Sequence, residues 1–193
     1  MMRAQRTKRI GWIMVCVLLL GSLVLPSPSQ GASAQAINAG ADRTLAMFRS
    51  QVKGADAFLR IAKGLLIFPE VIQGGIGIGG EYGEGVLRIG GKSVAYYSLA
   101  AGSIGFQLGA QRKSIIIAFL QNGALQTFRA RAQGNKSWQV GVDGSVAILN
   151  LGAQASLTPA SFSHQPIVGF VFAQAGLMYD LSLRGSKITK LQR

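Results

Sequence analysis

Cysteine and histidine are almost absent from this 193-residue chain, which contains one of each, Cys16 and His164. A disulfide needs two cysteines, and a zinc site needs three or four ligands, mainly from cysteine, histidine and carboxylate side chains. His164 lies in the polar stretch 161–166, where a surface loop is expected and no hydrolytic motif accompanies it. The sequence therefore predicts no disulfide, no metal site, no catalytic residue and no cofactor.

Acidic residues are also scarce, since 7 Asp and Glu stand against 20 Lys and Arg and the formal net charge is +13. Such an imbalance predicts an anionic partner, for example a phospholipid surface or a nucleic acid. Residues 35–84 contain five basic and five acidic residues, whereas residues 85–193 contain eleven basic residues against Asp143 and Asp180. After the first 34 residues, the positive excess therefore belongs to the C-terminal part of the chain.

Residues 1–34 have the pattern of an export signal. Four basic residues within positions 1–9 precede an apolar run at 10–25, and small residues follow. Positions 32–34 and 34–36 both fit the small-x-small rule for cleavage, so the mature chain is expected to start near Gln35 or Ile37. An uncleaved anchor is the alternative, but a membrane-spanning helix usually needs about 20 apolar residues. We therefore expect an exported protein, periplasmic or secreted, that loses Cys16 with its signal peptide.

Residues 35–193 are expected to form a single domain that begins with helices. Apolar residues recur at helical spacing over 42–53 and 56–63, with Asp42 and Asp56 at N-cap positions and Gly64 as a stop. An amphipathic helix on a membrane gives the same pattern, but packing on a sheet is the favoured reading. A further short helix is expected near 123–132.

Beyond residue 65 the hydrophobic period changes to two, which is typical of strands. Ten short segments separated by glycines fit this period: 65–68, 76–82, 85–89, 94–99, 104–110, 115–119, 138–142, 146–151, 168–172 and 177–183. Their alternation suits antiparallel strands with one buried face. The predicted fold class is α+β, with N-terminal helices packed on a twisted antiparallel β-sheet or partly closed barrel.

Nucleotide-binding motifs appear in the sequence but lack their required context. Residues 75–80 match G-x-G-x-x-G, yet strand-like sequence follows where a phosphate loop needs a helix. Residues 90–93 resemble the end of a Walker A loop, but Val86 occupies the position of its first glycine. Glu81 and Glu84 lie three residues apart on an extended chain, so they face opposite sides and form no acid/base pair. No enzymatic activity is expected.

Six sequence blocks together form a pattern that is more specific than any one glycine motif. They are AKGLLIFP at 62–69, GGIGIGGEYGEGVLRI at 74–89, GKSVAYY at 91–97, GFQLGAQ at 105–111, WQVGVDG at 138–144 and GSKITK at 185–190. Over roughly residues 40–193 the chain resembles the SYLF domain, a lipid-binding module of eukaryotic endocytic and actin-associated proteins and of exported bacterial proteins.

The resemblance implies a non-enzymatic domain that binds phosphoinositides or other anionic phospholipids through a basic surface, without a metal or cofactor. The basic residues inside the matching blocks are the candidate lipid-binding residues: Lys63, Arg88, Lys92, Lys187 and Lys190. Where many relatives have a charged or aromatic residue after the first glycines, this chain has Ile76 and Ile78. That departure bears on how this segment would meet a membrane.

The predicted function is therefore peripheral binding of an anionic phospholipid membrane by an exported protein. The alternative is a periplasmic envelope scaffold whose basic face binds a protein or an anionic glycan. Nucleic-acid binding is not expected, because the basic residues lack interleaved stacking aromatics and export separates the protein from most nucleic acid. Actin is not an expected partner either, since an exported protein does not meet it in its own cell.

Overall fold

Two helices begin the described part of the chain. The computed structural model describes residues 31–105, 110–149, 156–158, 160, 162, 164–173, 176–177 and 183–193. Most of the expected signal peptide therefore lies outside the described residues, and Ala32–Arg193 is one compact unit. Helix α2 spans Ala34–Gln51 and α3 spans Ala55–Ile61, which confirms the two expected helices.

The start of each helix differs from the prediction. Ser33 is the N-cap of α2, and its Oγ accepts a hydrogen bond of 3.1 Å from the backbone N–H of Ala36. The buried stripe of α2 already begins at Ile37, so Asp42 lies in the helix interior and not at its N-cap. Gly54, with φ of 87°, occupies the N-cap of α3, and Asp56 lies in the first turn. A left-handed backbone at residue 54 favours glycine there.

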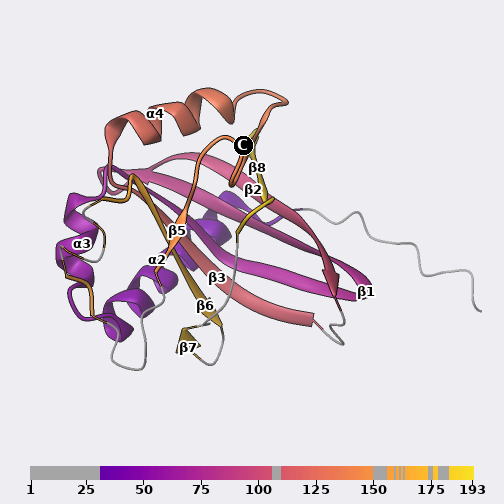
Figure 1. Cartoon of the computed structure of the whole chain (residues 1–193), viewed down its shortest axis with the longest axis horizontal. Coiled ribbons are helices and arrows are strands. Elements are labelled where there is room, and N and C mark those ends of the chain that lie inside the picture. The colour runs from indigo at the N-terminus through magenta and orange to yellow at the C-terminus, as the bar shows by residue number, and fades with distance from the viewer. Residues whose placement is uncertain are drawn as a thin grey trace, which may run out of the picture. The chain divides into compact units, whose positions relative to one another are not determined.

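The strands of the unit form one curled sheet (Figure 1). Its strands are β1 (Gly64–Ile89), β2 (Lys92–Gly105), β3 (Ala110–Phe119), β4 (Ser137–Gln139), β5 (Ala147–Ile148), β6 (Ile167–Ala173), β7 (Gly176–Leu177) and β8 (Lys187–Leu191). The strand order is β4-β8-β2-β1-β3-β6-β5, and β7 pairs with β6. The α+β class is confirmed. Parts of the segments predicted at 104–110, 146–151 and 177–183 lie outside the described residues.

One strand pair departs from the predicted antiparallel pattern. β5 and β6 pair in parallel, whereas the other pairs between described strands are antiparallel, so the sheet is mixed. Parallel neighbours need a crossover of a dozen or more residues, and the chain between Ile148 and Ile167 is long enough to provide one.

Strand β1 doubles back on itself. Its first half, 64–74, pairs with β3, and its second half, 77–89, pairs with β2. A Cβ atom at Gly83 would lie 2.6 Å from the carbonyl oxygen of Glu70. Extended residues so far apart in sequence can touch only if the chain reverses between them, so the two halves lie side by side. The glycine run 74–80 therefore contains this reversal, and strand follows it where a phosphate loop would need a helix, as predicted.

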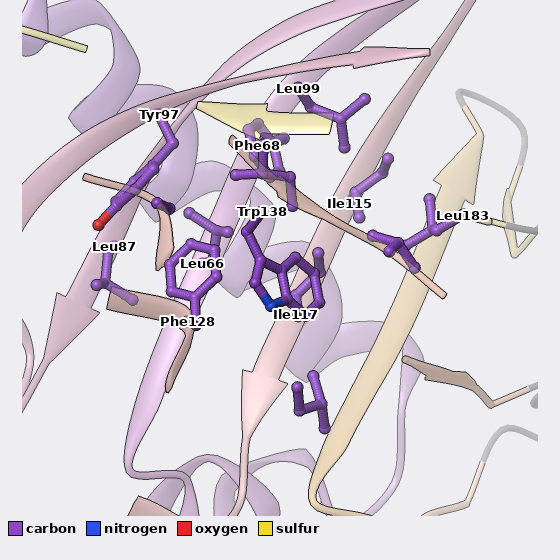
Figure 2. Packing of buried hydrophobic residues seen from close by; sticks show 14 of the residues in the cluster. Leu66, Phe68, Leu87, Tyr97, Leu99, Ile115, Ile117, Phe128, Trp138 and Leu183 are labelled. Carbon is purple, nitrogen blue, oxygen red and sulfur yellow. The ribbon is translucent and has the colours of Figure 1, made fainter. Parts of the chain in front are cut away.

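The inner face of the curled sheet holds one hydrophobic cluster, which α4 (Asn122–Arg131) covers. Figure 2 shows Trp138 of β4 beside Phe128 of α4, with ring centroids 5.4 Å apart. Trp138 and Val171 belong to strands near opposite ends of the strand order, yet both lie in this cluster. The sheet must curl to bring them together. Leu125 and Phe128 lie on the buried side of α4, which confirms the short helix expected near 123–132.

A second cluster lies on the other face of the sheet, beneath α2 and α3. Phe48 of α2 packs on Phe170 of β6 with ring centroids 4.8 Å apart, and Phe58 of α3 lies 5.2 Å from the same ring. The apolar sides of both helices thus face the sheet, which confirms packing on a sheet as their role (Figure 1). No helix in the described residues has both the length and the apolar content to span a membrane.

Candidate functional site

Every carboxylate among the described residues takes part in an ion pair. The pairs are Arg49–Asp56 (3.0 Å), Arg88–Asp42 (2.6 Å), Arg112–Glu70 (2.9 Å), Lys113–Glu81 (2.7 Å), Arg131–Asp143 (2.7 Å) and Arg193–Glu84 (2.7 Å). The exposed basic residues that form no ion pair within the described part of the chain are Arg43, Lys53, Arg60, Lys63, Lys92, Arg129, Lys136, Lys187 and Lys190. These side chains carry the positive charge that remains available to a ligand.

A groove lies between α2, α3 and the turn that joins β1 to β2, and we call it the helix–hairpin groove. Its apolar lining is Leu45, Leu59, Ala62 and Leu65, and its charged lining is Asp42, Arg49, Asp56, Arg60 and Arg88. Gly64, Gly90 and Gly91 complete it. Both carboxylates in the lining are already paired with arginines, so the groove has a positive excess.

Lys63 and Lys92 do not line this groove themselves, but each is the direct chain neighbour of a glycine that does. Gly90 and Gly91 have φ of 57° and 78°, as the central residues of a tight type I′-like hairpin turn require. The turn therefore presents two residues without side chains, and Lys92 follows as the first residue of β2. Both lysines are exposed.

Arg88 also lies at the groove, but its guanidinium is engaged within the protein. Its side chain is only 13% exposed, and Nη1 donates to Asp42 at 2.6 Å while Nη2 donates to the carbonyl oxygen of Asn38 at 3.2 Å. The side chain of Asn38 bonds in turn to Ser93 and Tyr96 of β2. Arg88 thus ties the sheet to α2, and direct contact between Arg88 and lipid stays a prediction.

The ion pair with Arg88 makes Asp42 a source of stability that depends on pH. The hydrogen bond from Arg88 holds the pKa of Asp42 below its ordinary value of 3.8. Asp42→Asn should lower the free energy of unfolding by about 1 kcal/mol, because the carboxylate is largely exposed and solvent screens the pair. Since the folded-state pKa is lowered, this contribution is complete above pH 3.8 and is lost as the pH falls further.

Urea unfolding at several pH values measures this contribution. The matched control is Glu70→Gln, because Glu70 and its partner Arg112 are both more than half exposed, and its effect should be near zero. A wild-type advantage over Asp42→Asn that is unchanged well below pH 3.8 would contradict the assignment.

The two remaining predicted residues, Lys187 and Lys190, lie on β8 and away from the groove. They are three residues apart on an extended strand, so they project to opposite sides, and Ile188 between them is fully buried. In register, Lys190 pairs with Tyr97 and Lys187 with Ala100. The structure therefore brings Lys63, Arg88 and Lys92 together, and it leaves the β8 lysines apart from them and from each other.

Two cations of the groove, Arg49 and Arg60, were not among the predicted site residues. Both occupy the last turn of their helices, α2 and α3, where a basic side chain also interacts favourably with the helix dipole. Because the helix dipole already accounts for a basic residue in each last turn, nothing in the sequence assigned these two arginines to a site. In the structure, the ends of both helices meet at the same groove. His164 is exposed in a turn, as expected, and no described residues cluster as a possible metal site.

Comparison with known proteins supplies the family. Residues 100–193 match the family model Ysc84, described as Las17-binding protein actin regulator, and no curated protein matches the chain. The match covers the second half of β2 and the elements that follow it, whereas every residue lining the helix–hairpin groove precedes it. Three of the six sequence blocks, at 105–111, 138–144 and 185–190, lie within this match, and residues 100–193 therefore belong to the SYLF (Ysc84) family of lipid- or protein-binding modules.

Proposed function

We propose that the protein is an exported, non-enzymatic module that binds the surface of anionic phospholipid membranes. The observation that carries the proposal is the ion-pair pattern: each described carboxylate has a basic partner, and the exposed cations left over have none within the described residues. A lysine or arginine near an anionic membrane surface contributes about 1 kcal/mol of attraction. Several such residues on one side of a domain suffice for peripheral binding.

The helix–hairpin groove is the favoured contact within this proposal. Arg60, Lys63 and Lys92 are exposed, lie on or beside its lining, and have no carboxylate partner among the described residues. Its hollow form allows cations from different elements to surround one phosphate group. Phosphoinositides carry additional phosphate groups, so they should bind more tightly than lipids with a single phosphodiester.

Co-sedimentation of Ala32–Arg193 with vesicles tests the proposal. This unit contains both hydrophobic clusters, and its use removes the apolar run 10–25 that would itself bind lipid. We expect binding to phosphatidylcholine vesicles that contain phosphatidylglycerol, weakening at high salt, and none to phosphatidylcholine alone. Lys63→Glu with Lys92→Glu should lower the affinity by roughly thirty-fold or more, since two attractive charges become repulsive.

The matched control is Lys187→Glu with Lys190→Glu, which changes the net charge by the same amount. Its effect should be smaller, because these two side chains project to opposite sides of β8 and cannot both reach one flat surface. Circular dichroism should be unchanged in both variants. Recovery with neither kind of vesicle would rule out lipid and favour a protein or glycan ligand, and equal recovery with both would rule out selectivity for anionic lipid.

A further inference from the structure

Two exposed aliphatic side chains flank the cations of the helix–hairpin groove. Ile61 is 44% exposed and lies between Arg60 and Ala62, which both line the groove. Val94 is 47% exposed and lies two residues after Lys92. Single exposed apolar residues are common on protein surfaces, so exposure alone implies nothing. Here, however, each lies within two residues of an exposed cation that lines the same groove or adjoins its lining.

A β-bulge accounts for the exposure of Val94. The register between β1 and β2 pairs Leu87 with Ala95 but Arg88 with Ser93, so Val94 is an extra residue in β2. Bulges of this kind redirect a side chain away from the regular alternation of the strand. Ala95 packs against the inner cluster, whereas Val94 remains largely in solvent. An aliphatic residue held outward by a local irregularity contributes nothing to either hydrophobic cluster.

Cations combined with nearby aliphatic side chains suit one ligand better than the others. A glycan or a nucleic acid would use the charges but would leave Ile61 and Val94 in water. A membrane uses both, because its phosphate layer lies directly above the acyl chains, and interfacial segments gain affinity from buried apolar area as well as from charge. Among the described residues, the other large exposed hydrophobic residues are Ile72, Tyr82 and Val142, and none of them has a basic residue within two positions in the chain.

We propose that Ile61 and Val94 insert into the boundary between headgroups and acyl chains while Arg60, Lys63 and Lys92 contact lipid phosphates. The inference rests on the proposed lipid binding and adds its orientation: the domain docks with the helix–hairpin groove towards the bilayer. Affinity then has two parts, an electrostatic part that salt weakens and an apolar part that salt leaves intact.

Tryptophan fluorescence tests the orientation. Trp138 is the one tryptophan of Ala32–Arg193 and is 1% exposed, so its emission should hardly respond to vesicles. Ile61→Trp and Val94→Trp should each shift to shorter wavelength with anionic vesicles and be quenched by brominated acyl chains. Ile72→Trp and Val142→Trp, at positions that are 45% and 74% exposed, should show neither effect.

A matched pair of double variants measures the apolar part. Ile61→Ser with Val94→Ser should lower the affinity for anionic vesicles by about tenfold, and the factor should persist at high salt. Ile72→Ser with Val142→Ser removes the same two residue types elsewhere and should leave the affinity unchanged. Circular dichroism checks that both variants fold.

The outcomes separate this inference from the proposed function. If the wild type fails to co-sediment with anionic vesicles, the lipid function itself is wrong. If the wild type co-sediments but the probes at 61 and 94 stay in water, lipid binding stands and the docking orientation is overturned. A spectral shift at 72 or 142 in place of 61 and 94 would also overturn it and would assign docking to a different surface.

Discussion

Glu81→Leu should destabilise the domain by about 3–5 kcal/mol, because it removes the partner of a buried cation. Nζ of Lys113 lies 2.7 Å from the carboxylate of Glu81, and the two side chains are only 2% and 11% exposed. Glu81 lies on the second half of β1 and Lys113 on β3, on either side of the first half of β1. Without the carboxylate, the ammonium group would stay buried without a counter-charge, and chemical denaturation would measure the loss.

A double variant distinguishes the cost of an unpaired charge from that of lost packing. Glu81→Leu combined with Lys113→Met removes both charges at similar volume, and such replacements of buried pairs are often neutral or stabilising. We therefore expect the double variant to recover most of the stability that Glu81→Leu loses. If the double variant is as unstable as Glu81→Leu alone, the ion pair does more than keep each buried charge from being unpaired. It then stabilises the fold in its own right.

Gly85→Ala should destabilise the domain by about 3 kcal/mol, because the two halves of β1 approach each other too closely there for a side chain. A Cβ atom at residue 85 would lie 2.6 Å from Cδ1 of Phe68 and would overlap the carbonyl oxygen of Ile67. Backbone cannot move aside as the end of a flexible side chain can. Thermal or urea unfolding measures the effect.

Other glycines of the same strands provide the controls. Cβ atoms at Gly74 and Gly102 would meet nothing within 4 Å, and neither glycine has a left-handed backbone. Gly74→Ala and Gly102→Ala should therefore be neutral or slightly stabilising, since alanine reduces the entropy of the unfolded chain. If Gly74→Ala and Gly102→Ala lowered the free energy of unfolding as much as Gly85→Ala, close packing at residue 85 would not be the cause. The result would show instead that β1 and β2 tolerate alanine poorly at every glycine.

Patterns within a few residues were readable from the sequence. The apolar spacing of α2 and α4 and the two-residue period of β1 and β2 predicted elements that the structure contains. The glycine run 74–80 was also correctly interpreted as turn and strand and not as a phosphate loop, because no helix-forming sequence follows it. Such patterns reflect which side of an element is buried, and burial shapes the choice of residues along the chain directly.

Features that depend on distant partners were not readable in the same way. Arg88 looked like any other basic residue of the hairpin, but Asp42, 46 residues earlier, neutralises it across the groove. The bulge at Val94 and the parallel pairing of β5 with β6 likewise arise from how strands meet in space. For the candidate site, the sequence therefore supplied Lys63 and Lys92, while the groove that connects them with Arg49 and Arg60 required the fold.

The pairing of β2 with β8 has a consequence for how the protein is made. One edge of β2 meets β1 across a two-residue turn, but the other meets β8, where Ser98 pairs with Thr189, 91 residues later. Until synthesis passes Leu191, that edge has no partner, and Ile188 is missing from the inner cluster. An unpaired edge strand can pair with another chain. Nascent or truncated chains should therefore self-associate, and closure of the sheet by β8 is the step that ends this exposure.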